Sequence, residues 1–213
     1  MNSHPEIIKK CRYHGMHDAA YPRFPVYENV TILAPGPNGR DFWKDVKYDD
    51  DEVIAVNAGI MIPVPANIWI VADGNAVKCD WFNWGCKKFG SLKVWSEAIY
   101  QRTQEIGDNT FWMYPNHPDQ VEDFLKLPFA VDPDFYRPTE TVTGIAIDFA
   151  VRHGAKHINL IGVDMEGGYH DDPPELKRDT VNSYMRDSLQ REIKYFQEHG
   201  ITFKSLSPTR LEI

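Results

Sequence analysis

The chain has 213 residues, 42% hydrophobic and 25% charged, a composition that excludes a mainly disordered, collagen-like or coiled-coil protein. This length fits a single domain over residues 1–213, large enough to bury a core without a disulfide or a metal staple. The net charge of -8 argues against nucleic-acid and anionic-membrane partners, because both need a basic surface.

The cysteines and the apolar runs indicate a cytoplasmic protein. Cys11, Cys79 and Cys86 are an odd set with no disulfide-framework spacing. No apolar run reaches the ~18 residues that a membrane span needs, and the first residues lack a signal-peptide core. Cys11 has His14 and His17 beside it but no fourth zinc ligand nearby, so we expect no metal site there.

Short apolar runs closed by glycine or polar turn residues predict strands that are buried on both faces. The clearest are 29–34, 52–57 and 67–72, with further candidates at 92–95, 110–114, 157–163 and 201–206. Residues 1–28 and 79–90 are expected to be irregular.

Helical periodicity appears in 119–127, in 142–153 and from 174 onward. Gly154 and Gly200 follow the last two patterns, where a left-handed residue would end a helix. Alternating strands and helices predict an α/β fold, Rossmann-like, with a mainly parallel sheet flanked by helices.

The carboxyl ends of parallel strands share one edge of the sheet, and polar residues follow several of the predicted strands there. The first loop contains Gly36, Pro37, Asn38 and Gly39, whose backbone amides could bind phosphate. The loop lacks the GxGxxG spacing and a Walker lysine, so a plain turn is the alternative. Asn57 and Asp73 each follow a strand directly and are expected to line the same cleft.

The stretch 141–170 combines a helix start, an amphipathic helix, a strand and an acidic glycine-rich loop. Thr143 and Gly144 would present amides to an anion, or a threonine there is only an N-cap. Asp164 is a candidate ribose, metal or acid/base group, and a carboxylate that caps nearby amides is its alternative. His170 is a candidate proton donor or acceptor, with a surface histidine as the competing interpretation.

Aromatic residues near the strands could stack on a sugar or a base, but aromatic side chains in such positions are more often part of a core. We therefore expect core roles for Trp69, Trp81, Phe82, Trp84 and Trp95.

Three blocks carry a resemblance to known proteins: the loop at 35–38, the strand end AVNAGI followed by NIWIVAD, and TGIAIDFAVRHGAKHINLIGVDMEGGYH. From about residue 29 onward, the chain resembles a Rossmann-like family. That family groups the flagellin-modifying motility accessory factor glycosyltransferases with hydroxymethylpterin pyrophosphokinase, and it is related to the bacterial lipooligosaccharide sialyltransferases.

The resemblance implies that the first loop and Asn57 contact a nucleotide. It also implies that Thr143 and Gly144 face the phosphates or the transferred group, and that the loop 164–170 closes the site. Asn38 stands where the family usually has serine, and Asn159 and Glu166 stand near the places of two sialyltransferase tyrosines. The sialyltransferases' histidine base has no match, so either His170 has taken over that role or the reaction differs.

These observations predict a transferase with a nucleotide or nucleotide-sugar donor and a hydroxyl acceptor, with His170 and Asp164 as catalytic residues. One alternative is a Mg-ATP-dependent pyrophosphokinase in which Asp73 and Asp164 hold the metal ion. Another is a non-catalytic nucleotide-binding module. Homo-oligomerisation is left open.

Overall fold

The computed structural model describes residues 28–45, 52–88, 90, 92–103, 110–115, 135–136, 141–165 and 183–213. Its centre is an eight-stranded sheet with the order β6-β5-β4-β3-β2-β1-β7-β8. Every neighbouring pair of strands is parallel, which confirms the predicted α/β class. The strands are β1 (Asn29–Leu33), β2 (Glu52–Val56), β3 (Ile68–Val71), β4 (Leu92–Ser96), β5 (Thr110–Pro115), β6 (Phe135–Tyr136), β7 (His157–Ile161) and β8 (Thr202–Ser205).

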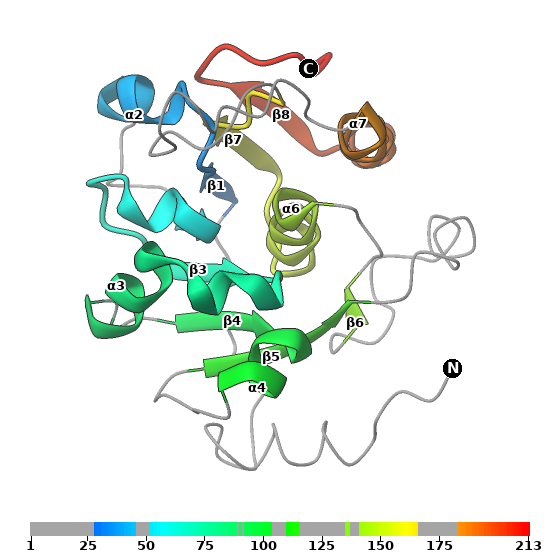
Figure 1. Cartoon of the computed structure of the whole chain (residues 1–213). Helices are drawn as coiled ribbons and strands as arrows, with labels where there is room; N and C mark the ends of the chain where they lie inside the picture. Colours follow the sequence, from blue (N-terminus) through cyan, green and yellow to red (C-terminus); the bar gives the residue numbers. More distant parts are fainter. Residues whose placement is uncertain are drawn as a thin grey trace.

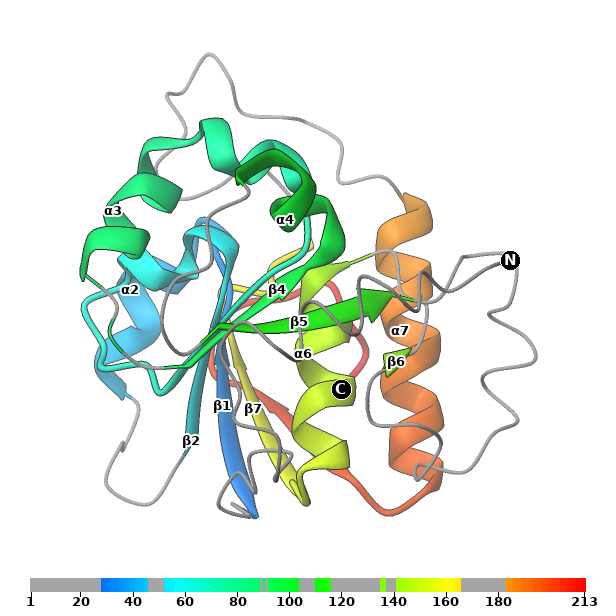
Figure 2. The ribbon, with the colours of Figure 1, turned by 90° about the horizontal axis from the view of Figure 1, so that it is seen from below.

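Helices cover both faces of this sheet (Figure 1). The α-helices are α2 (Gly39–Phe42), α3 (Asp80–Lys88), α4 (Glu97–Thr103), α6 (Val142–Arg152) and α7 (Ser183–Glu198). Short 3-10 turns are η1 (Trp43–Asp45), η2 (Asn57–Met61) and η3 (Gly74–Lys78). In Figure 2, α6 and α7 lie side by side on one face, and α2 and α3 lie on the other.

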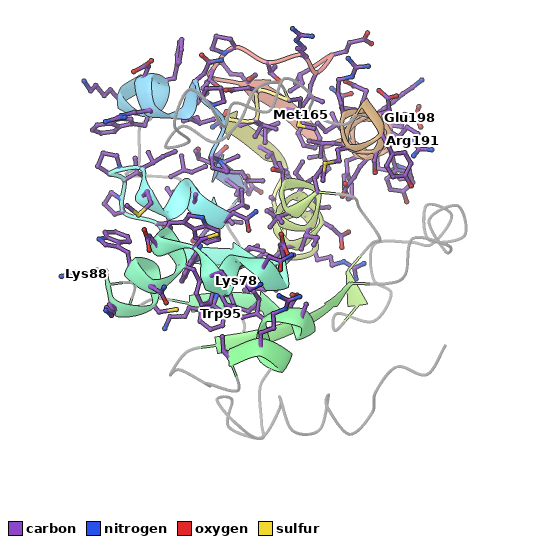
Figure 3. All side chains as sticks on the ribbon, in the orientation of Figure 1. Lys78, Lys88, Trp95, Met165, Arg191 and Glu198 are labelled. Carbon is purple, nitrogen blue, oxygen red and sulfur yellow. The ribbon has the colours of Figure 1, made fainter. Side chains whose placement is uncertain are left out.

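Alternate residues of each central strand enter different cores, as the two-residue period of a strand requires. Val30, Ile32, Ile54 and Ile70 are buried against α6 and α7 in the larger cluster. Trp69, Val71 and Trp95 point to the opposite face and pack with Phe82 of α3. Charged side chains such as Lys88, Arg191 and Glu198 occupy the outer faces of the helices (Figure 3). The chain therefore has three layers.

The predicted strands are all present, with ends shifted by one or two residues. Gly154 and Gly200 have φ angles of 98° and 87°, so both adopt the predicted left-handed conformation after α6 and α7. The expectation of irregular structure at 79–90 is wrong, because α3 occupies most of it. This helix was missed because only Phe82 and Gly85 are buried along it, too few to give a helical period. The predicted helix at 119–127 lies outside the described residues.

The aromatic prediction holds for three residues: Trp69, Phe82 and Trp95 are at most 3% exposed. Trp81 is half-buried, whereas Trp84 is 42% exposed and belongs to the surface. None of the helices in the described part of the chain is long and apolar enough to cross a membrane.

Candidate functional site

The strand order reverses beside β1, which has β2 on one side and β7 on the other. The chain leaves β1 for α2 on one face, and beyond β7 the helix α7 lies on the opposite face (Figure 2). In open parallel sheets, ligands bind outside the carboxyl ends of the strands at such a switch point. The loop at 34–39 and the turn at 162–165, hereafter the first loop and the β7 turn, meet there.

The two segments are joined by hydrogen bonds across the switch point. The Gly36 amide donates to the carbonyl of Gly162 at 2.8 Å, and the Asn38 amide donates to Oδ2 of Asp164 at 2.7 Å. A Cβ on Gly36 would lie 2.2 Å from the Gly162 carbonyl oxygen, so glycine is needed for this loop-to-loop contact. The sequence predicted phosphate binding for Gly36, whereas the structure shows that this residue is needed for the contact between two loops. A Gly36→Val variant would disrupt this contact, so it could not separate an effect on binding from an effect on folding.

The other members of the first loop differ in exposure. Pro37 is exposed and Asn38 is half-buried. Gly39 is buried at the start of α2, where an added Cβ would come within 2.9 Å of the Ala34 carbonyl oxygen. Pro37 is therefore the accessible member of the predicted phosphate loop, and Gly36 and Asn38 are partly accessible.

Asp164 is 1% exposed and braces the first loop through the Asn38 amide. This contact is the alternative role that the sequence suggested for it, a carboxylate that caps a nearby amide. The acid/base role of Asp164 stays a prediction.

Asn57 lies at the carboxyl end of β2, next to β1, with φ at 47°. Asparagine tolerates this left-handed conformation better than most residues. The residue is 8% exposed, and its Oδ1 is buried with no hydrogen-bond partner. A buried acceptor left without a donor costs about 1–3 kcal/mol, which makes Asn57 a candidate ligand contact.

Asp73 follows β3, the strand beside β2, so it shares the carboxyl edge with Asn57 as predicted. Its exposed side chain accepts a hydrogen bond from the Asn75 amide at 2.8 Å and caps η3. Asp164 follows β7, three strand spacings away in the sheet order, which corresponds to roughly 14 Å. A shared metal ion would need an oxygen of each carboxylate within ~2–3 Å of the ion, so Asp73 and Asp164 cannot hold one ion together.

The start of α6 is capped from within. Thr141 is the N-cap, and its hydroxyl accepts a hydrogen bond from the Gly144 amide at 2.9 Å. The Gly144 amide is therefore used by the cap, which was the alternative to anion binding. Thr143 is 8% exposed, and its predicted contact with a phosphate stays a prediction.

His170, Glu166 and the candidate zinc ligands Cys11, His14 and His17 lie outside the described residues. Within the described ranges, no group of three or more histidine, cysteine, aspartate or glutamate side chains is placed to hold a metal ion.

Two supporting features were not predicted from the sequence. The indole of Trp69 donates to the Asn57 carbonyl at 3.0 Å, and the hydroxyls of Ser207 and Thr209 bond to the β7 turn. A tryptophan in a buried strand is predicted to be a core residue, and serine and threonine after the last strand are predicted to lie in a loop. Nothing in the local pattern marks either feature.

Solved structures with a similar fold include two sialyltransferases and a glycosyltransferase. The sialyltransferase Cst-I from Campylobacter jejuni matches with a TM-score of 0.56 and 14% identity, over 87% of this chain and 80% of that chain. CstII from the same organism, solved with CMP-3FNeuAc, matches with a TM-score of 0.53 and 13% identity, over 84% and 81%. The MAf glycosyltransferase from Magnetospirillum magneticum AMB-1 matches with a TM-score of 0.56 and 14% identity.

The MAf match covers 87% of this chain and 33% of that protein, so the chain corresponds to about a third of its length. No protein-family model matches the chain, and no curated protein matches it by sequence. At 12–14% identity, these likenesses establish a shared fold.

Proposed function

We propose that the chain is a glycosyltransferase with a nucleotide-activated sugar as donor, and that the nucleotide binds at the carboxyl edge of β2, β1 and β7. The observation that carries the proposal is Asn57, whose buried Oδ1 lacks a partner beside the switch point. An unpartnered acceptor calls for a donor such as a ribose hydroxyl or the exocyclic amine of a base. Asn57 and the β7 turn are two strand spacings apart, about 10 Å, a span that suits a nucleoside monophosphate.

The shared fold supports a cytidine nucleotide as the first donor to test. CstII has been solved with CMP, and with CMP together with a trisaccharide acceptor. A transferase of this kind positions the donor and acceptor and stabilises the departing phosphate. The amides of Gly36, Asn38 and Gly39 all donate within the protein, so the first loop does not offer them to a phosphate in this structure. The side chains of Thr143 and Asn38 are therefore the proposed phosphate contacts, and a sugar hydroxyl is the proposed acceptor.

We propose His170 as the group that deprotonates the acceptor hydroxyl, with Asp164 as the alternative base. The His170→Ala variant should lower kcat by about 100-fold or more with little change in CMP affinity, because proton transfer matters mainly in the transition state. An unchanged kcat in His170→Ala would make Asp164 the preferred base.

The pyrophosphokinase alternative would need a metal site other than the Asp73 and Asp164 pair. The test is thermal unfolding with CMP, UDP, GDP, ADP and ATP, each with magnesium and with a chelator. A ligand at 100 times its Kd adds about 2.7 kcal/mol, which raises Tm by roughly 5–10 °C in a chain of this size. We expect stabilisation by CMP that persists in the chelator, and release of CMP from a CMP-sugar when an acceptor is supplied.

A shift that appears only with ATP and magnesium would favour the pyrophosphokinase. Binding of CMP without turnover of any CMP-sugar would favour the non-catalytic module.

A further inference from the structure

After β8, residues 206–213, hereafter the tail segment, run along the β7 turn. The paired register of β7 and β8 ends at Leu160 and Ser205, and one more main-chain bond follows, from the Leu206 amide to the Leu160 carbonyl at 2.9 Å. Pro208 has no amide proton, so the main chain cannot extend the ladder there. Beyond Leu206, the bonds to the β7 turn come from the Ser207 and Thr209 hydroxyls and from the Arg210 amide.

Each residue of the β7 turn from 162 to 164 makes a hydrogen bond with the tail segment. The Gly162 amide donates to the Ser207 hydroxyl at 2.9 Å, and the Thr209 hydroxyl donates to the Val163 carbonyl at 2.6 Å. The Arg210 amide donates to the Asp164 carbonyl at 3.1 Å. The tail segment therefore follows the turn residue by residue.

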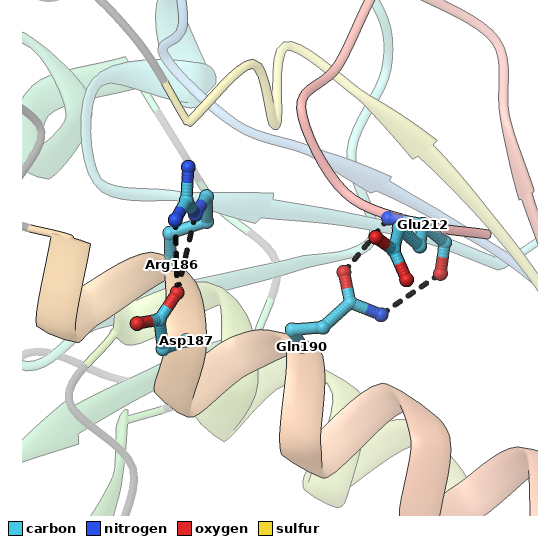
Figure 4. A network of polar contacts seen from close by, with 4 residues as sticks. All are labelled: Arg186, Asp187, Gln190 and Glu212. Atoms are coloured by element: carbon cyan, nitrogen blue, oxygen red, sulfur yellow. Dashed lines mark hydrogen bonds and ion pairs between the residues drawn. The ribbon is translucent and has the colours of Figure 1, made fainter.

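The far end of the tail segment is fastened to α7. The side chain of Gln190 makes two hydrogen bonds with the main chain of Glu212, at 2.8 and 2.7 Å (Figure 4). Leu211, 7% exposed, belongs to the core cluster beneath α6 and α7. The tail segment is thus fixed at β8, at the β7 turn and at α7.

The β7 turn contains one residue in an unfavourable backbone conformation. Met165 has a φ angle of 56°, in the left-handed region that costs free energy for a residue with a side chain, whereas Gly162 adopts its φ of 69° freely. The same turn carries the two bonds to the first loop, from Gly36 and from Asn38. A continuous set of hydrogen bonds therefore connects α7 with the first loop through the tail segment and the β7 turn.

We propose that the tail segment is a positioning element of the nucleotide site. Thr209 and Ser207 hold the β7 turn in the form in which Asp164 braces the first loop, and Gln190 holds the tail segment in place. This inference rests on the proposed function, because the first loop and the β7 turn form the edge at which the nucleotide is proposed to bind.

The test compares variants that lose a bracing bond with matched controls that keep it. The Thr209 hydroxyl also accepts a hydrogen bond from the Leu211 amide at 3.2 Å, inside the tail segment. Thr209→Val keeps the shape of the side chain and removes its hydroxyl, whereas Thr209→Ser keeps the hydroxyl. Gln190→Ala releases Glu212. Its control is Asp187→Ala, one turn earlier on α7, which removes the hydrogen-bond partner of Arg186 and leaves the bonds between Gln190 and the tail segment in place (Figure 4). Ser205→Ala is a further control, because the Ser205 hydroxyl bonds from the end of β8 to the Ser207 carbonyl and not to the β7 turn.

CMP affinity is measured by calorimetry, and amide hydrogen exchange is followed at 36–39 and 162–164. We expect Thr209→Val and Gln190→Ala to weaken CMP binding by about 5-fold or more, with faster exchange in both segments. Thr209→Ser, Asp187→Ala and Ser205→Ala should bind CMP as the unmodified chain does.

Equal CMP affinity in Thr209→Val and the unmodified chain would overturn the positioning role and leave the proposed function standing. Equal weakening in Thr209→Val and Thr209→Ser would also overturn it, because the hydroxyl would then not matter. Failure of the unmodified chain to bind any nucleotide would overturn the proposed function, and this inference with it.

Discussion

The indole Nε1–H of Trp69 donates a hydrogen bond to the main-chain carbonyl of Asn57 at 3.0 Å. Trp69 is fully buried, and the rings of Phe82 and Trp95 lie 5.6 and 5.7 Å from its own. Because this aromatic cluster cannot shift without losing its packing, the bond fixes the left-handed backbone that orients the Asn57 side chain. This bond connects the core on one face of the sheet with the proposed nucleotide site.

Trp69→Phe should weaken CMP binding several-fold and lower the free energy of unfolding by about 1–3 kcal/mol. The variant removes the donor to the Asn57 carbonyl while keeping an aromatic ring in the cluster. Calorimetry with CMP and urea unfolding measure the two effects. Phe82→Leu is the control, since it perturbs the same cluster without touching Asn57, and it should leave CMP affinity unchanged. Equal weakening in both variants would mean that packing, rather than this bond, sets the affinity.

Asn57→Gly should raise the Kd for CMP by about 10-fold or more while changing the free energy of unfolding by less than ~1 kcal/mol. Glycine accepts a φ of 47°, and the Asn57 Oδ1 makes no hydrogen bond that the folded chain would lose. Asn57→Ala should show the same loss of affinity together with a destabilisation of about 1–2 kcal/mol from backbone strain. Undiminished CMP binding in Asn57→Gly would exclude this residue from the site.

The variants Gly162→Ala and Gly200→Ala should differ in how far they lower the free energy of unfolding. The comparison separates the cost of backbone strain from that of a steric clash. Both residues have positive φ, but a Cβ on Gly200 would meet nothing within 4 Å, whereas a Cβ on Gly162 would lie 2.2 Å from the Ala34 carbonyl oxygen. Gly200→Ala should cost about 1–2 kcal/mol, and Gly162→Ala more than about 3 kcal/mol. Urea unfolding of the two variants measures the difference. Similar losses would show that the switch-point loops can separate at little cost.

Glu52 should make the chain less stable as the pH rises. Burial at the start of β2 raises the pKa of this carboxyl to about 7, from 4.5 in the unfolded chain. Between these values the folded state binds more protons, so its stability falls as pH rises from about 4.5 through 7. Glu52→Gln should remove this dependence and stabilise the chain at pH 8 by on the order of 1–3 kcal/mol.

The measurement for Glu52 is urea unfolding of both proteins across this pH range. The comparison must be between the variant and the unmodified chain, because burial lowers the pKa of His153 and this adds its own loss of stability at acidic pH. Parallel stability curves for the two proteins would contradict the prediction.

The strands and the ends of α6 and α7 were predictable from the sequence because their signals are local. An apolar run such as 52–57 records burial on both faces of one strand, and Gly154 and Gly200 record left-handed residues after two helices. The sequence also predicted that the polar residues lie at the carboxyl edge of the sheet. This signal is local too, since each of these residues follows its own strand.

Tertiary structure alone decided how those residues are used. Asn38 and Asp164 are 126 positions apart, and only the placement of β7 beside β1 makes the Asp164 carboxylate a brace for the first loop. The same placement puts three strand spacings between Asp73 and Asp164, which removes the metal pair that the sequence allowed. The hydroxyls of Ser207 and Thr209 gain their role from β8 lying next to β7. A local pattern records what a residue is buried against, whereas the strand order determines which distant residue it meets.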